Sequence, residues 1–136
     1  MPHYRFKEAS ELLGVSDDTL RRWVDQGRLA AGTDDAGRHV IDGAALAAFA
    51  HERAAEAPRP TPRPVVSESA RNRFVGLVTR VTRDTVMAQV EIQAGPHRLV
   101  SLMSREAADE LDLQPGVLAV AAVKSTNVVV ELPEAP

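Results

Sequence analysis

The sequence contains no cysteine among its 136 residues, which excludes disulfide bonds and thiolate metal ligands. It also lacks an uninterrupted apolar run close to the roughly 20 residues that a membrane-spanning helix needs. The first residues, Met1 to Arg5, are not followed by the apolar stretch of a secretion signal. We therefore expect a cytoplasmic protein without a membrane partner.

An excess of positive charge is missing too, since the formal net charge is -3. Coating nucleic acid nonspecifically needs several cations acting together, so any DNA binding must come from local placement of basic residues. The sequence also shows no Ser-His-Asp order, no phosphate-binding loop, no metal-spaced histidine cluster and no convincing carboxylate pair. These absences argue against an enzyme, and we expect no cofactor.

Proline is concentrated in one segment, 54–68, where four prolines occupy alternate positions. Such spacing favours extended polyproline II over helix or sheet. The preceding chain is rich in Ala, Leu, Glu and Arg, whereas the following chain is rich in Val and Thr with short runs bounded by turn residues. The sequence predicts an α+β protein of two domains, mostly helical at 1–53 and mostly β at 69–133, with a linker at 54–68.

The first domain has the pattern of two short helices joined by a tight turn. The first helix is expected to bury the apolar side chains Phe6, Ala9, Leu12 and Leu13. Gly14 permits the turn, and Ser16 is a good N-cap for a second helix that begins at Asp17. The second helix is expected to bury Leu20, Trp23 and Val24. A third helix, capped by Asp42, closes the small core.

Hydroxyl and guanidinium groups on the outside of the second helix suit entry into the major groove of DNA, where they contact phosphates or guanine. They are Ser16, Thr19, Arg21 and Arg22. The ungapped segment from Glu8 to Trp23 resembles the DNA-binding domains of MerR-like and excisionase-like proteins, which are winged helix-turn-helix domains. That resemblance implies a β wing at 28–41 with Arg38 as a phosphate contact, although Asp34 and Asp35 make this wing more acidic than usual.

In the second domain, the alternation of Val86, Ala88, Val90 and Ile92 predicts a half-buried strand. Further strands are expected at 97–103, 117–123 and 127–132. Ser104 is expected to cap a short helix that buries Ala107, Ala108 and Leu111. The sequence thus predicts an OB-like five-stranded β-barrel with one short helix, small enough that we expect it to oligomerise.

Three segments in this order closely resemble the molbindin family, also called Mop or TOBE domains: Ser69–Asn72 followed by Gly76, the helix at 104–113, and Val123–Val128. The resemblance implies molybdate or tungstate as ligand, bound at a subunit interface of a homodimer or hexamer that assembles through this domain. The oxyanion-binding residues it implies are Ser69, Ala70, Arg71, Asn72, Ser101, Ser104, Lys124, Ser125 and Thr126. No cationic metal is expected.

A tetrahedral dianion without protons needs only hydrogen-bond donors, and Arg71, Lys124 and the serines supply them. The leading hypothesis is therefore a molybdate- or tungstate-binding, DNA-binding regulator of molybdenum uptake or use. The alternative is an intracellular molybdate storage or buffering protein without sequence-specific DNA binding. The negative net charge and the acidic wing favour this alternative.

Overall fold

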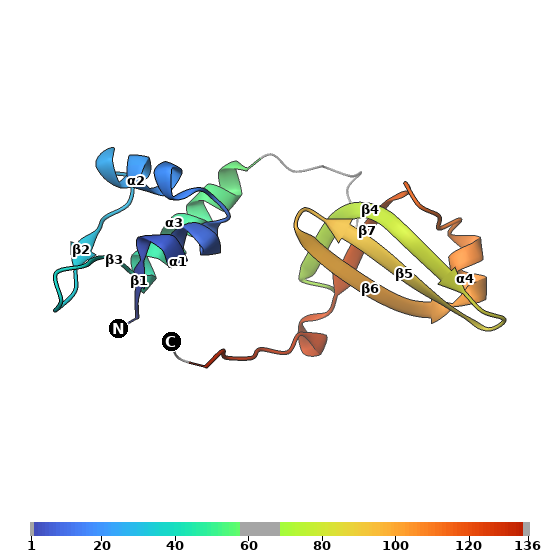
Figure 1. Cartoon of the computed structure of the whole chain (residues 1–136). Helices are drawn as coiled ribbons and strands as arrows, with labels where there is room; N and C mark the ends of the chain where they lie inside the picture. Colours follow the sequence, from blue (N-terminus) through green and yellow to red (C-terminus); the bar gives the residue numbers. More distant parts are fainter. Residues whose placement is uncertain (1, 58–68, 135–136) are drawn as a thin grey trace. The chain divides into compact units, whose positions relative to one another are not determined.

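The computed structural model describes residues 2–57 and 69–134, and the chain divides into two compact units, 1–59 and 60–136 (Figure 1). Each unit has its own apolar core. Residues 58–68, which form most of the predicted linker, lie outside the described residues. Within the described part of the chain, no helix is both long and apolar enough to cross a membrane.

The first unit combines three helices with a small antiparallel sheet. Its elements are β1 (His3–Arg5), α1 (Phe6–Leu13), α2 (Asp17–Asp25), β2 (Gly32–Thr33), β3 (His39–Asp42) and α3 (Gly43–Glu56). The strands lie in the order β1-β3-β2. The predicted helices are present, but β1 was not expected, and α3 continues to Glu56, inside the segment predicted as linker.

Local chemistry explains where these helices begin and end. Gly14 takes a left-handed conformation with φ 70°, which ends α1, and its N–H donates to the Glu11 carbonyl oxygen at 3.1 Å. Ser16 accepts a hydrogen bond from the Thr19 N–H at 3.2 Å and so caps α2. Asp42 caps α3 in the same way, as predicted.

The first unit buries nearly all of its large apolar side chains in one core. Its buried apolar side chains are Ala9, Leu20, Trp23, Leu29, Ile41, Leu46 and Phe49. The prediction that Leu12 is buried is wrong, because 65% of this residue is exposed. Leu12 lies about 100° around the helix from Leu13, which packs against the core beside Ala9, and an eight-residue helix buries only a narrow stripe.

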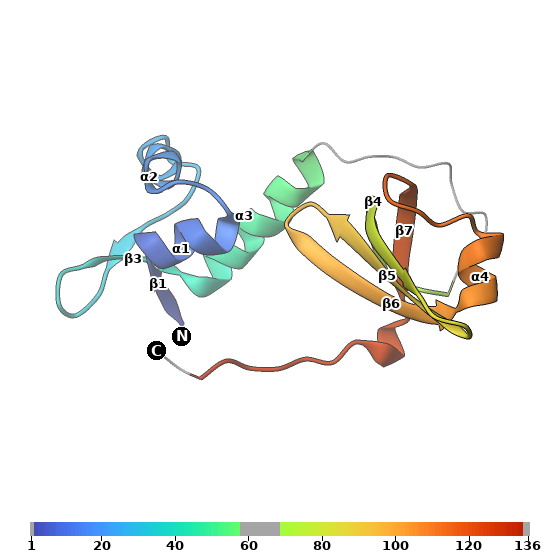
Figure 2. The same ribbon diagram turned by 45° about the vertical axis from the view of Figure 1, so that its right-hand side comes forward.

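The second unit is a curled antiparallel sheet with an OB-like outline (Figure 2). Its elements are β4 (Asn72–Arg83), β5 (Met87–Ala94), β6 (His97–Ser104), α4 (Arg105–Glu110), β7 (Leu118–Val123) and the 3-10 turn η1 (Ser125–Asn127). The strands lie in the order β6-β5-β4-β7. The long strand β4 pairs first with β7 and then with β5, and a bulge between Val78 and Arg80 bends it.

The predicted fifth strand at 127–132 does not form in the described chain. Asn127 belongs to η1, and residues 128–132 pair with no described strand. The described strands therefore make a four-stranded sheet rather than the expected five-stranded barrel. A run of valines favours a strand, but a strand also needs an unpaired strand edge within reach, and the sequence pattern does not show whether one is there.

Two further burial predictions in the second unit are wrong. Leu111 is 64% exposed because α4 ends at Glu110 and only Ala108 is fully enclosed. Val86 is 68% exposed because it lies in the turn before β5 rather than in the strand. The remaining alternation holds, since Ala88, Val90 and Ile92 are all buried.

Gly76 allows β4 to pack tightly against β5. It is buried, and a Cβ atom there would collide with the Gln93 carbonyl oxygen and lie 2.8 Å from the Gln93 carbonyl carbon. These are backbone atoms, which cannot move aside as a flexible side chain can. The glycine of the Ser69–Gly76 motif therefore has a steric role in the sheet.

Candidate functional site

Two of the predicted anion-binding segments meet at one end of the sheet. Asn72 lies opposite Val123 in the β4–β7 ladder, and Asn72 Nδ2 donates a hydrogen bond to the Val123 carbonyl oxygen at 3.2 Å. Arg71 directly precedes this pair and Lys124 directly follows it. A single chain therefore brings the two segments together, although the sequence separates them widely.

We call this group the end cluster: Ser69, Ala70, Arg71, Asn72, Lys124, Ser125 and Thr126. Arg71 and Lys124 are exposed, and in the described part of the chain neither forms an ion pair. Lys124 precedes η1, which holds Ser125 and Thr126. Among the described residues, no three or more His, Asp or Glu side chains gather as a cation site. The end cluster thus offers donors suited to an anion.

The other two predicted anion ligands lie elsewhere in the unit. Ser104 pairs with Met87 at the far end of β5, beside the end of β4 that is opposite Asn72. Its hydroxyl caps α4 by accepting the Ala107 N–H at 3.1 Å. Ser101 pairs with Val90 in the middle of β6. Neither serine joins the end cluster of its own chain.

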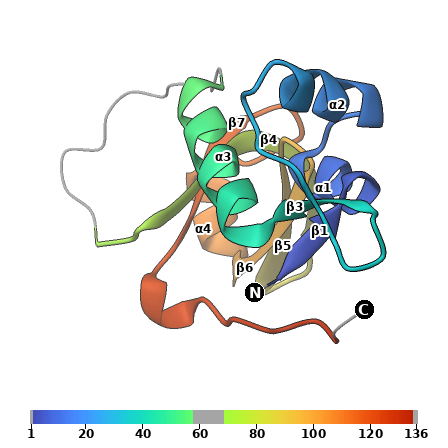
Figure 3. The same cartoon turned by 90° about the vertical axis from the view of Figure 1, so that its left-hand side faces the viewer.

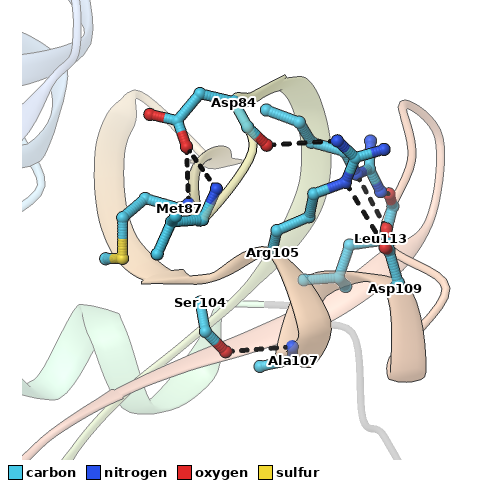
Figure 4. Close-up of polar contacts among 9 residues, drawn as sticks. Asp84, Met87, Ser104, Arg105, Ala107, Asp109 and Leu113 are labelled. Atoms are coloured by element: carbon cyan, nitrogen blue, oxygen red, sulfur yellow. Dashed lines mark hydrogen bonds and ion pairs between the residues drawn. The ribbon is translucent and has the colours of Figure 1, made fainter.

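A tight turn fixes the chain just before β5 (Figure 4). The Asp84 carboxylate accepts the Met87 N–H at 2.7 Å and the Val86 N–H at 2.8 Å. These backbone hydrogen bonds, that of Met87 foremost, hold the pKa of Asp84 below its usual 3.8. The turn also carries the Val86 carbonyl oxygen, which accepts the Arg105 N–H at 2.8 Å.

Two arginines tie α4 to this turn (Figure 4). Arg105 Nη1 donates to the Asp84 carbonyl oxygen at 3.2 Å. Arg83 donates through Nε to Asp109 at 3.0 Å and through Nη2 to the Leu113 carbonyl oxygen at 2.8 Å. The start of α4, and Ser104 with it, therefore has a fixed position relative to β4 and β5.

An apolar groove of about 640 Å³ separates β6 from β7. Its lining includes Leu99, Met103, Leu113, Val117, Ala119 and Ala121. Among the described residues that line the groove, Ser101 alone has a polar side chain. No described strand fills the space between these two strand edges.

The first unit has a hollow of about 560 Å³, lined by residues of β1, α1, α2, the β2–β3 loop and β3, which we call the basic hollow. Figure 3 shows the ribbons of these elements. Its lining residues are Arg5, Phe6, Lys7, Glu8, Arg21, Arg38 and His39. Cationic side chains thus gather locally in a chain whose net charge is -3. Sequence reasoning found Arg21 and Arg38 but missed Arg5, Lys7 and His39, because β1 and its pairing with β3 were not foreseen.

Phe6 lines the basic hollow beside two of its other lining residues, Arg21 and His39. The guanidinium carbon of Arg21 lies 5.8 Å from the Phe6 ring centroid, and the His39 ring centroid lies 5.9 Å from it. Arg22 is exposed on α2 but does not line the hollow. Ser16 and Thr19 lie at the start of α2, where their hydroxyl oxygens are 3.0 Å apart.

Asp34 organises the turn of the wing. Its carboxylate accepts the backbone N–H groups of Ala36 and Arg38, each at 2.9 Å, and Arg38 Nε at 3.0 Å. The backbone hydrogen bond from Arg38 is the main cause of the lowered pKa of Asp34. One of the two acidic wing residues therefore serves the local fold, while Asp35 remains exposed.

Comparison with known proteins assigns both units. A TOBE domain profile matches residues 68–130, and a helix-turn-helix domain profile matches residues 4–54. Molybdenum-pterin-binding protein 2 of Clostridium pasteurianum is 35% identical over 66 residues, which cover 48% of this chain and 97% of that protein. The chain therefore belongs to the TOBE (molbindin) family, and it carries a helix-turn-helix domain before its TOBE domain.

Two solved structures are similar to the second unit. A molybdate binding protein from Sporomusa ovata is 30% identical, with a TM-score of 0.48, over 49% of this chain and 100% of that protein. MopII from Clostridium pasteurianum is 34% identical, with a TM-score of 0.46, over 48% of this chain and 100% of that protein.

Proposed function

We propose that the protein binds molybdate or tungstate through its second unit and DNA through its first, and regulates molybdenum uptake or use. The observation that carries the anion proposal is the Asn72–Val123 pairing, because it places Arg71 and Lys124 at one end of the sheet. The relatives named for molybdenum or molybdate binding match this same unit.

The end cluster has the chemistry that an oxyanion requires. Segments 69–72 and 124–127 contain guanidinium, ammonium, amide and hydroxyl donors but no carboxylate. A hydrogen bond to a charged group contributes about 1.5 to 3 kcal/mol, so four or five such bonds support micromolar binding after association costs. The bound anion would also offset the positive charges of Arg71 and Lys124.

The proposed site lies at a subunit interface. Ser104 lies at the opposite end of β4 from the end cluster, so it reaches the same anion only from a second copy. The start of α4 is held in a fixed position, so Ser104 would lose little conformational freedom when it binds the anion. Ser101, on β6, is proposed to act in the same way.

Calorimetry with molybdate, tungstate, sulfate and phosphate tests the anion site. We expect Arg71→Ala and Lys124→Ala each to weaken molybdate binding about 10- to 100-fold, the cost of one charge-assisted hydrogen bond. Arg80→Ala is the matched control, because Arg80 is an exposed cation of β4 away from the end cluster. Equal, negligible heats for all four anions would contradict the proposal.

The DNA proposal places α2 in the major groove and a backbone phosphate at the basic hollow. The hollow joins Arg21 of α2 to Arg38 of the wing, and Arg5 and Lys7 add charge beside them. A phosphate contact made by several cations gives affinity that falls steeply with salt. The Asp34 carboxylate is already bound to Arg38 and to the wing backbone. It therefore does not act as an isolated negative charge beside the DNA phosphate.

Footprinting on the promoter of the protein's own operon tests DNA binding. We expect protection that is lost in the Arg21→Ala, Arg22→Ala double variant and kept in Arg98→Ala, which changes an exposed cation of the second unit. Protection that responds to molybdate would support regulation. Absence of protection at low salt would instead favour the second candidate, a storage or buffering protein. The exposed Asp35 and the net charge of -3 also favour this candidate.

A further inference from the structure

We propose that Asp34 is a positioning residue for DNA binding, whose carboxylate holds the Arg38 guanidinium in place for a DNA backbone phosphate. This role rests on the proposed DNA-binding function of the first unit. It concerns a residue whose charge is of the wrong sign for DNA, because a carboxylate repels phosphate. The contacts of Asp34 nevertheless favour a supporting role over an opposing one.

The backbone of the β2–β3 loop fixes the place of Asp34. The Asp34 N–H donates to the Arg38 carbonyl oxygen at 2.9 Å, and the Gly37 N–H donates to the Asp34 carbonyl oxygen at 2.9 Å. Asp34 Oδ1 in turn accepts the N–H groups of Ala36 and Arg38, each at 2.9 Å. The carboxylate is therefore held by the loop itself, whether or not DNA is bound.

The second oxygen of this carboxylate has a different partner. Asp34 Oδ2 accepts a hydrogen bond from Arg38 Nε at 3.0 Å. A guanidinium has five N–H donors, and only one of them is on Nε. In the part of the chain that the structure describes, neither Nη nitrogen of Arg38 forms a hydrogen bond. The contact with Asp34 thus restrains the arginine and leaves most of its donors available to a phosphate.

The carboxylate also lies outside the surface where the phosphate is proposed to bind. Arg38 lines the basic hollow, but Asp34 and Asp35 are not among its lining residues. The Arg38 side chain is 54% exposed and that of Asp34 only 24%. Within the same hollow, Arg21 lies against the Phe6 ring, 5.8 Å from its centroid. Both arginines of the hollow, one from α2 and one from the wing, therefore have a neighbour that restrains them.

Such restraint favours phosphate binding. A free arginine side chain samples many rotamers and loses that freedom when it binds a ligand. An arginine that Asp34 already holds has less freedom left to lose. The opposing effect is the repulsion between the carboxylate and the phosphate, which water and salt weaken because the ion pair is exposed. We therefore expect the effect of position to exceed the effect of charge.

Binding of the full chain to the promoter fragment of its own operon tests this expectation with two charge-matched variants. Asp34→Asn keeps an oxygen that can accept the Ala36 and Arg38 N–H groups, but it replaces the acceptor of Arg38 Nε by an amide NH2. Asp35→Asn removes the same charge from an exposed neighbour. We expect Asp34→Asn to weaken binding about 3- to 10-fold. Asp35→Asn should strengthen binding, by no more than about twofold. Stronger binding by both variants would overturn the proposal.

Two further measurements show whether the effect passes through Arg38. In an Arg38→Ala background, Asp34→Asn should no longer weaken binding, because the arginine that it releases is gone. The plot of log K against log[salt] should become shallower by about 0.9, the contribution of one phosphate contact, in Asp34→Asn and in Arg38→Ala. It should keep its slope in Asp35→Asn. A loss of affinity that persists in the Arg38→Ala background would overturn the proposal and leave Asp34 a role in folding alone.

A measurement without DNA separates this role from the proposed function. In NMR spectra of the free full chain, the Arg38 Nε–H should exchange with water more slowly than it does in Asp34→Asn, because Asp34 accepts its hydrogen bond. Equal exchange in the two proteins would overturn the inference even if the wild type binds DNA. Slow exchange in a wild-type chain that does not bind the fragment would show that the DNA-binding function is wrong, and the inference with it.

Discussion

The two units of this chain differ in how much of their apolar surface they bury. In the first, seven apolar side chains are buried together, and Leu12 is its one large apolar residue exposed in the described structure. In the second, the buried cluster is Val78, Val90 and Ile92, while large apolar side chains remain exposed on strands, turns and the C-terminal segment. The first unit buries its large apolar side chains within itself, whereas the second leaves many of them exposed, as at the interfaces of proteins that form oligomers.

This difference agrees with what each unit is proposed to do. A DNA-binding head needs a rigid surface, and helix caps, a closed core and the Asp34-stabilised wing provide it. An anion site shared by two copies needs a surface that is incomplete alone. In both units, the extent to which the core is closed therefore agrees with the proposed function.

The largest expected effect breaks the first unit while sparing the second. Leu20→Ala removes a side chain that is 0% exposed, and we expect it to lower the free energy of unfolding of the first unit by about 3 kcal/mol. Trp23, the only tryptophan, reports this transition by fluorescence. Leu12→Ala should cost less than about 0.5 kcal/mol, because its side chain is largely exposed. Equal losses in the two variants would refute the closed-core description.

The second effect breaks the sheet of the second unit. Gly76→Ala forces a methyl group against the Gln93 backbone, and we expect a loss of about 2 kcal/mol in the free energy of unfolding of that unit. Scanning calorimetry measures it, while the Trp23 fluorescence transition should not move. Gly32→Ala is the control, since a Cβ atom there meets no atom within 4 Å.

A smaller effect tests how α4 is held. Arg83→Ala removes the hydrogen bonds to Asp109 and to the Leu113 carbonyl oxygen, and we expect about 1 kcal/mol of destabilisation because the arginine is partly exposed. Faster amide hydrogen exchange in α4 is the specific readout. Arg80→Ala, at a more exposed arginine 4.0 Å from Glu91, should leave that exchange unchanged.

The smallest effect concerns acid. The folded pKa of Asp84 lies below its unfolded value of 3.8, so the stability this carboxylate adds is present above that pH and is lost as the pH falls through the folded pKa. Asp84→Ala should therefore lower the melting temperature of the second unit at pH 7, and the difference from wild type should shrink below pH 3.8. A difference that stays constant down to pH 2 would assign the loss to something other than the charged form.

Much of the local structure could be predicted from the sequence. The Gly14 turn, the caps at Ser16, Asp42 and Ser104, and the alternation from Ala88 to Ile92 all depend on neighbours within a few residues, so the pattern contains the information. The family also followed from short ordered motifs. The exposure of Leu12 and Leu111 was missed because burial on a short helix depends on which side of the helix meets the core.

The sequence by itself determined the two-part organisation, the helix-turn-helix, the family and the set of donors available to an anion. Only the tertiary structure decided which donors meet: it joined Arg71 to Lys124 through the β4–β7 register, sent Ser104 to the other end of β4, and added Arg5, Lys7 and His39 to Arg21 and Arg38. It also left the last valines without a partner. The physical reason is that turns and caps are set by adjacent residues, whereas strand register and edge pairing depend on contacts between residues far apart in the chain.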